Sequence, residues 1–239
     1  MTTTPTPEEF LAACRVADEV FELRADYRAM LLVVDGIDPR ATSAMADELI
    51  AAAEAHARDL LADGQVEDLP HVAAWREAYR AFGAKPQRTR NSLEALTRRA
   101  GEGLPRVNAL TDVYNAISVL HQVPLGGEDF ALYEGPAHLA RATGEESFET
   151  ISGGETLVEH PKPGEVIWRD DAGVTCRRWN WRQGPRTALS EGTRTAFFIL
   201  DALGPMDDDA LSAAADALVE ELTSLGAEVM ASRRMIGAS

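Results

Sequence analysis

The sequence predicts a globular fold that combines α-helices with short β-strands, and three observations carry this prediction. Hydrophobic residues make up 45% of the 239 positions, which is ample for a real core. Before residue 120, apolar residues recur mainly at helical spacing. After Pro124, short apolar segments alternate with Gly, Pro and Asp-Asp turns, as strands do. We expect a single domain over residues 9–239, preceded by a disordered Thr/Pro-rich tail over residues 1–8.

Helical periodicity places four helices in the first half of the chain and one near its end. Ser92 opens a capping-box-like S-L-E-A, and Asp207 is placed to cap the last helix. The predicted helices cover residues 42–61, 70–82, 92–99, 107–118 and 208–225.

The predicted strands begin with an apolar run that ends in Asp-Gly and continue after Pro124. Gly126-Gly127 is most simply a turn, although such a pair also allows a backbone to approach a ribose or phosphate. Asp170-Asp171-Ala-Gly is typical of a hairpin turn. The predicted strands cover residues 27–37, 130–133, 138–141, 165–169, 174–181 and 195–200.

Charge is unevenly distributed along the chain. The net charge of −16 argues against a nucleic-acid partner, because phosphate binding depends on Lys and Arg. The middle of the chain is nevertheless locally basic, and each basic run is either a solvated face or part of one anion-facing side. The first cluster contains Lys85, Arg88, Arg90, Arg98, Arg99 and Arg106, and the second contains Arg177, Arg178, Arg182 and Arg186.

Other features narrow the class of protein. The sequence has no apolar run of about 20 residues, and its start lacks a secretory signal, so we expect a cytoplasmic protein without a membrane partner. Cys14 and Cys176 lack the spacing of a zinc site and are expected to be ordinary thiols. No metal or other cofactor is expected.

The segment WNWRQ, residues 179–183, holds two of the four tryptophans beside amide and cationic groups. As a strand it would place Trp179, Trp181 and Gln183 on one face and Asn180 and Arg182 on the other. Two aromatic rings beside hydrogen-bonding groups suit a ligand with a flat apolar part and a polar part. The same pattern also suits a core strand.

A second polar pattern lies on the predicted helix 107–118. Asn108, Asp112, Asn115 and Ser118 are spaced three or four apart and therefore share one flank. That flank either meets water or forms a polar wall over a pocket.

Several segments together resemble the freestanding B3/B4-domain proteins, single-domain relatives of the editing domain in the β-subunit of bacterial phenylalanyl-tRNA synthetase. The resemblance covers roughly residues 20–228. The segments that carry it are FGAKPQRTRNSLEALTRRA, LPRVNALTDVYNAISVLHQVPLGGEDF, RDDAGVTCRRWNWRQ and SEGTRT.

The resemblance implies an α/β (α+β) fold with a central, mostly antiparallel sheet flanked by helices. It also implies editing in trans, in which water hydrolyses the ester of a mischarged tRNA carrying an aromatic or related amino acid. The implied partner is the tRNA acceptor end, without DNA. In this chain RQGPRT and SEGT replace the synthetase's glycine-rich pocket motif.

The residues are compatible with that chemistry. No G-x-S-x-G elbow is present and no histidine is near either cysteine in sequence, so a covalent nucleophile is not indicated. Ester hydrolysis then needs an oriented water, oxyanion donors and a grip on the substrate. We predict catalytic roles for Glu191, Asn180 and Gln183, although Glu191 could equally cap a turn.

Further roles follow from the same interpretation. The predicted substrate-binding residues are Asn108, Asn115, Trp179, Trp181, Arg182, Gly126 and Gly127. Lys85, Arg88 and Arg90 are predicted to contact nucleic acid. Two alternatives stay open: a non-catalytic module that binds a tRNA acceptor end, an amino acid or a nucleotide-like ligand, and an esterase or amidase that acts on a small molecule.

Overall fold

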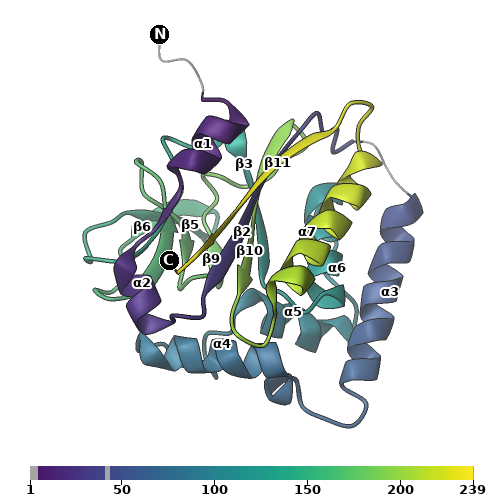
Figure 1. Ribbon diagram of the computed structural model, residues 1–239, viewed down its shortest axis with the longest axis horizontal. Coiled ribbons are helices and arrows are strands. Elements are labelled where there is room, and N and C mark those ends of the chain that lie inside the picture. The colour runs from purple at the N-terminus through teal and green to yellow at the C-terminus, as the bar shows by residue number, and fades with distance from the viewer. Residues whose placement is uncertain (1–4, 41–43, 239) are drawn as a thin grey trace.

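The structure, a computed structural model, describes residues 5–40 and 44–238 and contains both helices and strands, as predicted (Figure 1). Helix α3 is seen from Ala44, so residues 42 and 43 of the predicted helix lie outside the described residues. The α-helices are α1 (Pro7–Ala13), α2 (Asp18–Leu23), α3 (Ala44–Leu60), α4 (Pro70–Ala81), α5 (Ser92–Ala100), α6 (Ala109–Leu120) and α7 (Asp208–Thr223), with short 3₁₀ helices η1 (Val66–Asp68) and η2 (Phe130–Leu132).

The strands form two main sheets and a two-stranded hairpin rather than one central sheet. One sheet has the order β1-β4-β7-β8-β9, the second has the order β11-β2-β10-β3, and β5 pairs with β6. The β1–β4 pair is parallel, whereas the other strand pairs among the described residues are antiparallel. The strands are β1 (Arg15–Val16), β2 (Arg28–Asp35), β3 (Leu125–Asp129), β4 (His138–Arg141), β5 (Phe148–Ser152), β6 (Glu155–Glu159), β7 (Val166–Arg169), β8 (Val174–Arg177), β9 (Arg182–Gln183), β10 (Thr195–Ala202) and β11 (Met230–Gly237).

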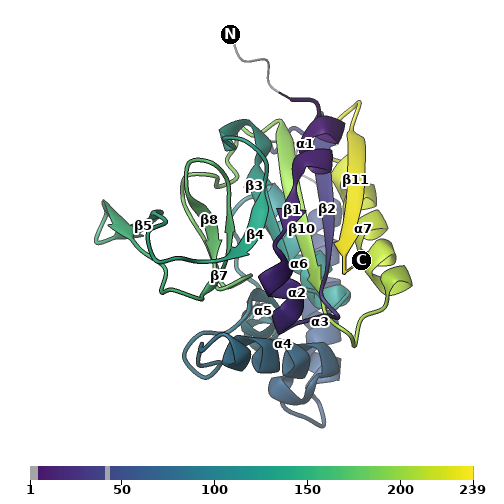
Figure 2. The same ribbon diagram turned by 60° about the vertical axis from the view of Figure 1, so that its left-hand side comes forward.

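The sheet that contains β2 and β10 is covered on both faces, which explains the nearly continuous apolar runs in these strands. On one face, Leu32 and Phe198 pack against α6 and α7. On the other face, Leu31 and Phe197 meet residues of the second sheet and of α1, α2 and α4. Figure 2 shows the two sheets side by side, with the β5 hairpin projecting from the body.

The segment WNWRQ is not a continuous strand. Strand β8 ends at Arg177, and the chain turns before β9 begins at Arg182. Arg178 and Trp179 adopt positive φ angles of 48° and 68°, which are incompatible with extended backbone. The predicted alternation of its side chains between two faces is therefore wrong.

The segment around Gly126-Gly127 also differs from its prediction. It forms strand β3. Residues 130–133, which were predicted to form a strand, instead include the 3₁₀ helix η2. Space requires glycine at position 127, because a Cβ there would lie 2.7 Å from Cε1 of Phe198 on the neighbouring strand. Gly126-Gly127 is thus a site of close packing inside a sheet.

The N-terminal part of the chain and the cap of α5 show two smaller differences. Helix α1 begins at Pro7, where Thr6 and Glu9 form a reciprocal capping box, so the predicted disorder is wrong for residues 7 and 8. Residues 1–4 lie outside the described part. Helix α5 is capped by Asn91, whose Oδ1 accepts the backbone N–H of Glu94 at 2.9 Å, rather than by Ser92.

No helix within the described ranges is long and apolar enough to cross a membrane.

Candidate functional site

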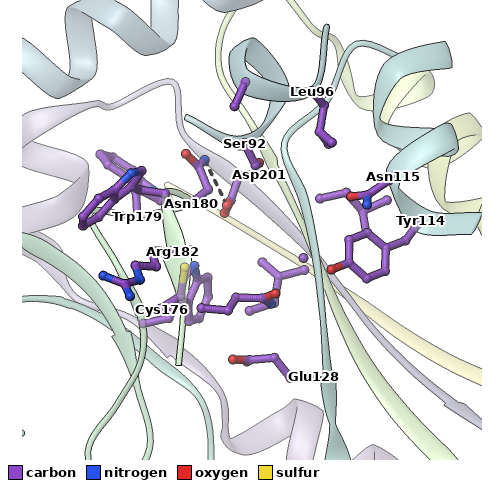
Figure 3. Close-up of a pocket in the computed structure, with 17 residues that line it drawn as sticks. Ser92, Leu96, Tyr114, Asn115, Glu128, Cys176, Trp179, Asn180, Arg182 and Asp201 are labelled. Atoms are coloured by element: carbon purple, nitrogen blue, oxygen red, sulfur yellow. Dashed lines mark hydrogen bonds between the residues drawn. The ribbon is translucent and has the colours of Figure 1, made fainter. Parts of the chain in front are cut away.

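A pocket of about 250 Å³ lies beside β3, the strand that ends the four-stranded sheet. Helices α5 and α6 form one wall and the turn between β8 and β9 forms another. Figure 3 shows Tyr114 and Asn115 on one side of the pocket and the segment from Trp179 to Arg182 on the other. We call this the central pocket. It is lined by Ser92, Ala95, Leu96, Tyr114, Asn115, Leu125, Gly126, Glu128, Trp168, Cys176, Trp179, Asn180, Trp181, Arg182, Gln183, Ile199 and Asp201.

A buried carboxyl group, that of Asp201 on β10, lines the central pocket and is 2% exposed. The hydroxyl of Tyr27 donates to its Oδ1 at 2.6 Å. Nδ2 of Asn180 donates to its Oδ2 at 3.2 Å, the bond drawn as a dashed line in Figure 3. Burial raises the pKa of Asp201 to about 7, because the loss of water disfavours the charged form. This group is therefore poised to gain or lose a proton near neutral pH.

A second buried carboxyl group belongs to Glu128 on β3. The hydroxyl of Thr187 donates to its Oε1 at 2.8 Å, and the hydroxyl of Tyr133 donates to its Oε2. Burial raises its pKa to about 7 as well. Because Glu128 pairs with Phe197, and Phe197 and Asp201 lie on the same face of β10, both carboxyl groups point between the sheets.

Sequence reasoning missed both carboxyl groups. Asp201 carried a usable signal, because it interrupts the otherwise apolar run of β10, and a charge in such a strand needs partners. Glu128 was hidden by the preceding glycines, which favoured a solvated turn over a buried strand.

The two predicted catalytic amides differ in their surroundings. Asn180 is held at both ends: its Oδ1 accepts from the hydroxyl of Tyr79 at 2.9 Å, and its Nδ2 donates to Asp201. Gln183 lies nearer the rim, where Nε2 donates to the backbone oxygen of Gly127 at 3.2 Å. Asn180 thus positions Asp201, whereas Gln183 keeps a second amide hydrogen that can reach a ligand.

Glycine 126 allows Gln183 to occupy this position. A Cβ at Gly126 would lie 2.8 Å from Nε2 of Gln183. Gly126 lines the central pocket, and Gly127 lines a neighbouring hollow that shares Tyr114, Arg182 and Gln183 with it.

The polar flank of α6 is divided by the fold. Asn115 lines the central pocket, is 7% exposed, and makes no side-chain hydrogen bond within residues 5–40 and 44–238. Asn108 instead caps α6, accepting the N–H of Thr111 at 2.9 Å, and lines the neighbouring hollow. Asp112 and Ser118 bond to Val107 N and Val123 O, so the predicted polar wall is reduced in the central pocket to Asn115.

The two tryptophans of WNWRQ have different roles. Trp179 is fully buried, with ring centroids 5.0 Å from Tyr27 and 5.2 Å from Trp75. Trp181 is partly buried, and the Arg178 guanidinium lies 4.3 Å from its ring centroid. Trp179 therefore supports the pocket from the core, while Trp181 forms part of its accessible rim.

The structure does not bring Glu191 to the central pocket. Glu191 is exposed in the turn before β10, and its carboxylate bonds to no described residue. Ser190 and Thr193 stabilise that turn instead, since Thr193 Oγ1 accepts Ser190 N at 2.9 Å. Neither the predicted catalytic role nor the alternative of a turn cap is supported by its position.

Arg182 is exposed at the rim, where it donates to Thr150 Oγ1 on β5. It lines both the central pocket and the neighbouring hollow.

The first basic cluster borders a separate depression of about 690 Å³, which we call the basic groove. Arg88 and Arg90 line it, and Lys85 lines an adjoining hollow that Arg88 also borders. All three predicted nucleic-acid contacts are exposed. The basic groove is lined by Arg88, Arg90, Ala95, Arg98, Arg99, Glu102, Gly103 and Trp181.

The second predicted basic cluster is not an anion-facing side, because carboxylates neutralise much of it. Arg177 is buried and donates to Glu165 and Glu159, the former at 2.8 Å. Arg186 is paired with Asp170 at 2.6 Å.

The cysteine of the pocket is not a poised nucleophile. Burial, with the nearby carboxylates of Glu128 and Asp201, holds the pKa of the Cys176 thiol well above its usual value. Within the described residues, no group of three or more His, Cys, Asp or Glu side chains could hold a metal ion.

Comparison with known proteins identified a matching family and solved structures with a similar fold. An N-terminal fragment of the phenylalanyl-tRNA synthetase β-subunit from Pyrococcus horikoshii is similar over 92% of this chain and 53% of the fragment, with 11% identity and a TM-score of 0.46. The chain spans about half the length of that fragment. No curated protein matches the chain. The family described as the B3/4 domain matches residues 74–225, more than half of the 239 positions, and the chain belongs to that family.

Proposed function

We propose that this protein hydrolyses the ester bond of a mischarged aminoacyl-tRNA in trans, with the amino acid in the central pocket. The observation that carries the proposal is the central pocket, which combines an apolar wall with buried polar groups. The chain that contains this pocket belongs to the B3/4 family. Its volume of about 250 Å³ is at the small end for ligand sites and suits a group of amino-acid size.

The lining favours a side chain with an apolar body and a polar end. Trp168, Trp179 and Ile199 supply apolar surface, and Asp201 supplies a hydrogen-bonding group beside them. Tyr27 and Asn180 hold that carboxyl group from behind, so it does not have to reorganise when a ligand binds. An aromatic or related amino acid meets both requirements.

The outer edge of β3 supplies a backbone donor in the hollow that adjoins the central pocket. The N–H of Asp129 points away from β10 and donates to Thr187 O at 2.8 Å. Since alternate residues of a strand direct their N–H groups to the same edge, the N–H of Gly127 points outward too. Gly127 N–H and the second amide hydrogen of Gln183 are our candidate oxyanion donors.

In the proposed reaction, water adds to the ester carbonyl and the bond to the ribose oxygen breaks. One proton of the water goes to the ribose oxygen, which leaves as a hydroxyl, and the carboxylic acid formed releases the other proton to solvent and becomes a carboxylate. Asn115, whose amide is free of described partners, is placed to hold the substrate amine or the water.

The test is a deacylation assay across a panel of mischarged tRNAs, with the parent and Gln183→Ala. We expect the parent to cleave at least one aminoacyl-tRNA and Gln183→Ala to be slower by about 10²-fold, as for loss of one oxyanion donor. Gln65→Ala is the matched control, because Gln65 is exposed and forms no side-chain cap. No cleavage of any pair by the parent at micromolar protein would refute the proposal.

A non-catalytic ligand-binding module is the second candidate. The observation that favours it is that Glu128 and Asp201 are both satisfied by internal donors, which leaves no free carboxylate as a base. Calorimetric binding of an amino acid or aminoacyl-nucleoside analogue, without turnover of any ester, would select this function.

A further inference from the structure

The basic groove contains cations that the protein itself does not neutralise. Arg90 and Arg98 share the buried carboxylate of Glu94, and Arg98 also pairs with Glu67. Arg88 and Arg99 are exposed and form no ion pair within the described parts of the chain. On a protein of net charge −16, two such arginines in one concave surface form a local anion-attracting site.

The adjoining hollow extends this surface. It is lined by Lys85 and Lys162, both exposed and without an ion pair to a described residue, and by Arg88. Arg88 thus borders both depressions and lies at the centre of a basic track.

The track leads to the central pocket. Trp181 and Ala95 line both the basic groove and the central pocket, so the two spaces meet at these side chains. Arg178 lies over the Trp181 ring, and this contact holds the indole in place as an aromatic wall between the two spaces. A polyanion in the groove would therefore deliver its end group to the pocket.

We propose that the basic groove binds the phosphate backbone of the single-stranded nucleotides that precede the aminoacylated 3′ end, with Arg88 and Arg99 as the phosphate contacts and Trp181 as the stacking surface for one base. The inference rests on the proposed function, because it takes aminoacyl-tRNA as the substrate. Single-stranded nucleic acid accounts for both the exposed arginines and the Trp181 ring, since binding sites for single strands combine basic grooves with aromatic stacking surfaces.

The experiment measures binding of a fluorescent single-stranded RNA that ends in the acceptor sequence, by anisotropy over a range of KCl concentrations. The variant is Arg88→Ala with Arg99→Ala. The control removes the same formal charge elsewhere through Arg58→Ala on α3 and Arg233→Ala on β11. Both arginines are exposed, and Arg233 is paired with Asp216. We expect at least tenfold weaker binding and a log–log salt slope lower by about 1.4, since each single-strand phosphate contact contributes about 0.7.

Two further measurements distinguish this inference from the proposed function. Hydrolysis of a small amino-acid ester without RNA should stay within twofold of the parent in the double variant, and Arg88→Lys with Arg99→Lys should restore the salt slope. Trp181→Leu should weaken RNA binding about tenfold at an unchanged slope, because stacking carries no counterion release.

An unchanged affinity and slope in Arg88→Ala/Arg99→Ala would overturn the groove assignment even if the parent cleaves aminoacyl-tRNA. Equal losses in the Arg58/Arg233 control would also overturn it, because the effect would then reflect net charge alone. If the parent protein binds RNA through Arg88 and Arg99 but cleaves no ester, the RNA-binding role of the groove is supported and the proposed function is refuted.

Discussion

The central pocket and the basic groove share Trp181, but the charged groups of the pocket are buried whereas those of the groove are exposed. The pocket buries Glu128 and Asp201 among tyrosine, threonine and asparagine donors, and burial raises the pKa of both carboxyl groups to about 7. The groove leaves Arg88 and Arg99 in water. Buried polar groups discriminate between ligands because an unmatched partner is costly, whereas exposed cations attract polyanions at long range with little discrimination.

The largest expected effect is on stability, and it distinguishes Trp179, on the core side of the central pocket, from Trp181 at its rim. Trp179→Ala removes a fully buried ring that packs against Tyr27 and Trp75, and should lower the free energy of unfolding by about 3–5 kcal/mol. Trp181→Ala should cost less than half as much, because this ring is only partly buried. Urea denaturation measures both, and equal losses would show that the two tryptophans are equivalent core residues.

The next effect concerns the amide that positions Asp201. Asn180→Ala leaves the Tyr79 hydroxyl and one side of Asp201 without a partner, and should destabilise the protein by about 1–3 kcal/mol for each group left unsatisfied. Gln183→Ala should change stability by under about 1 kcal/mol, since its hydrogen bond lies at the rim. If Asn180→Ala is as stable as Gln183→Ala, Asn180 is not a structural support of the pocket.

A pH-dependent effect follows from the buried carboxyl groups. In the unfolded chain an aspartic acid has a pKa of about 3.9, whereas the pKa of Asp201 in the folded protein is about 7. Between these values the folded state binds the extra proton. Asp201 therefore makes stability fall as pH rises from about 4 to about 7, by about 1.4 kcal/mol per pH unit.

Asp201→Asn should remove this contribution and make the pH profile of the unfolding free energy less steep over that window, with the contribution of Glu128 remaining. The same reasoning applies to Glu128→Gln, because the pKa of Glu128 is also raised to about 7. Denaturation at half-unit pH steps checks it, and parallel profiles for parent and variant would show that the carboxyl group titrates normally.

The smallest effect tests a residue outside both regions. Glu191→Gln should leave stability within about 0.5 kcal/mol and ester hydrolysis unchanged, because the carboxylate is exposed and bonds to no described residue. A marked loss of hydrolysis, measured on the substrate that the parent cleaves best, would restore the catalytic role predicted for Glu191.

Local signals in the sequence determined much of the secondary structure. The helical pattern of residues 70–82 and the turn residues before β8 were sufficient because helix periodicity and turn preferences are local properties. The predicted strand over residues 138–141 matches β4, and Asp207 caps α7 as expected. The B3/4 family was also recognisable from motifs in the sequence, and the match over residues 74–225 confirms it.

Tertiary packing determined the backbone conformation and burial of segments whose local sequence pattern indicated something else. Gly126-Gly127 has the composition of a turn, but it forms part of strand β3, where the ring of Phe198 leaves no room for a Cβ on Gly127. Trp179 and Trp181 are two residues apart, yet a positive-φ turn sends the first into the core and leaves the second at the rim.

The site required tertiary structure most of all. Asn115, Gln183 and Trp181 could be chosen from the sequence because amides and aromatic rings in motif-like segments stand out. Asp201 was signalled only by its place in an apolar strand, and Glu128 was not signalled, because the sequence does not show that β3 and β10 are neighbours. Nor does it show that Tyr27 and Thr187, from distant segments, donate to these carboxyl groups. Composition and periodicity therefore determined the longer helices and several strands, but not α1, α2, β5, β6 or β11. Long-range packing determined which charged groups lose their water, and so raised the pKa values of Asp201 and Glu128.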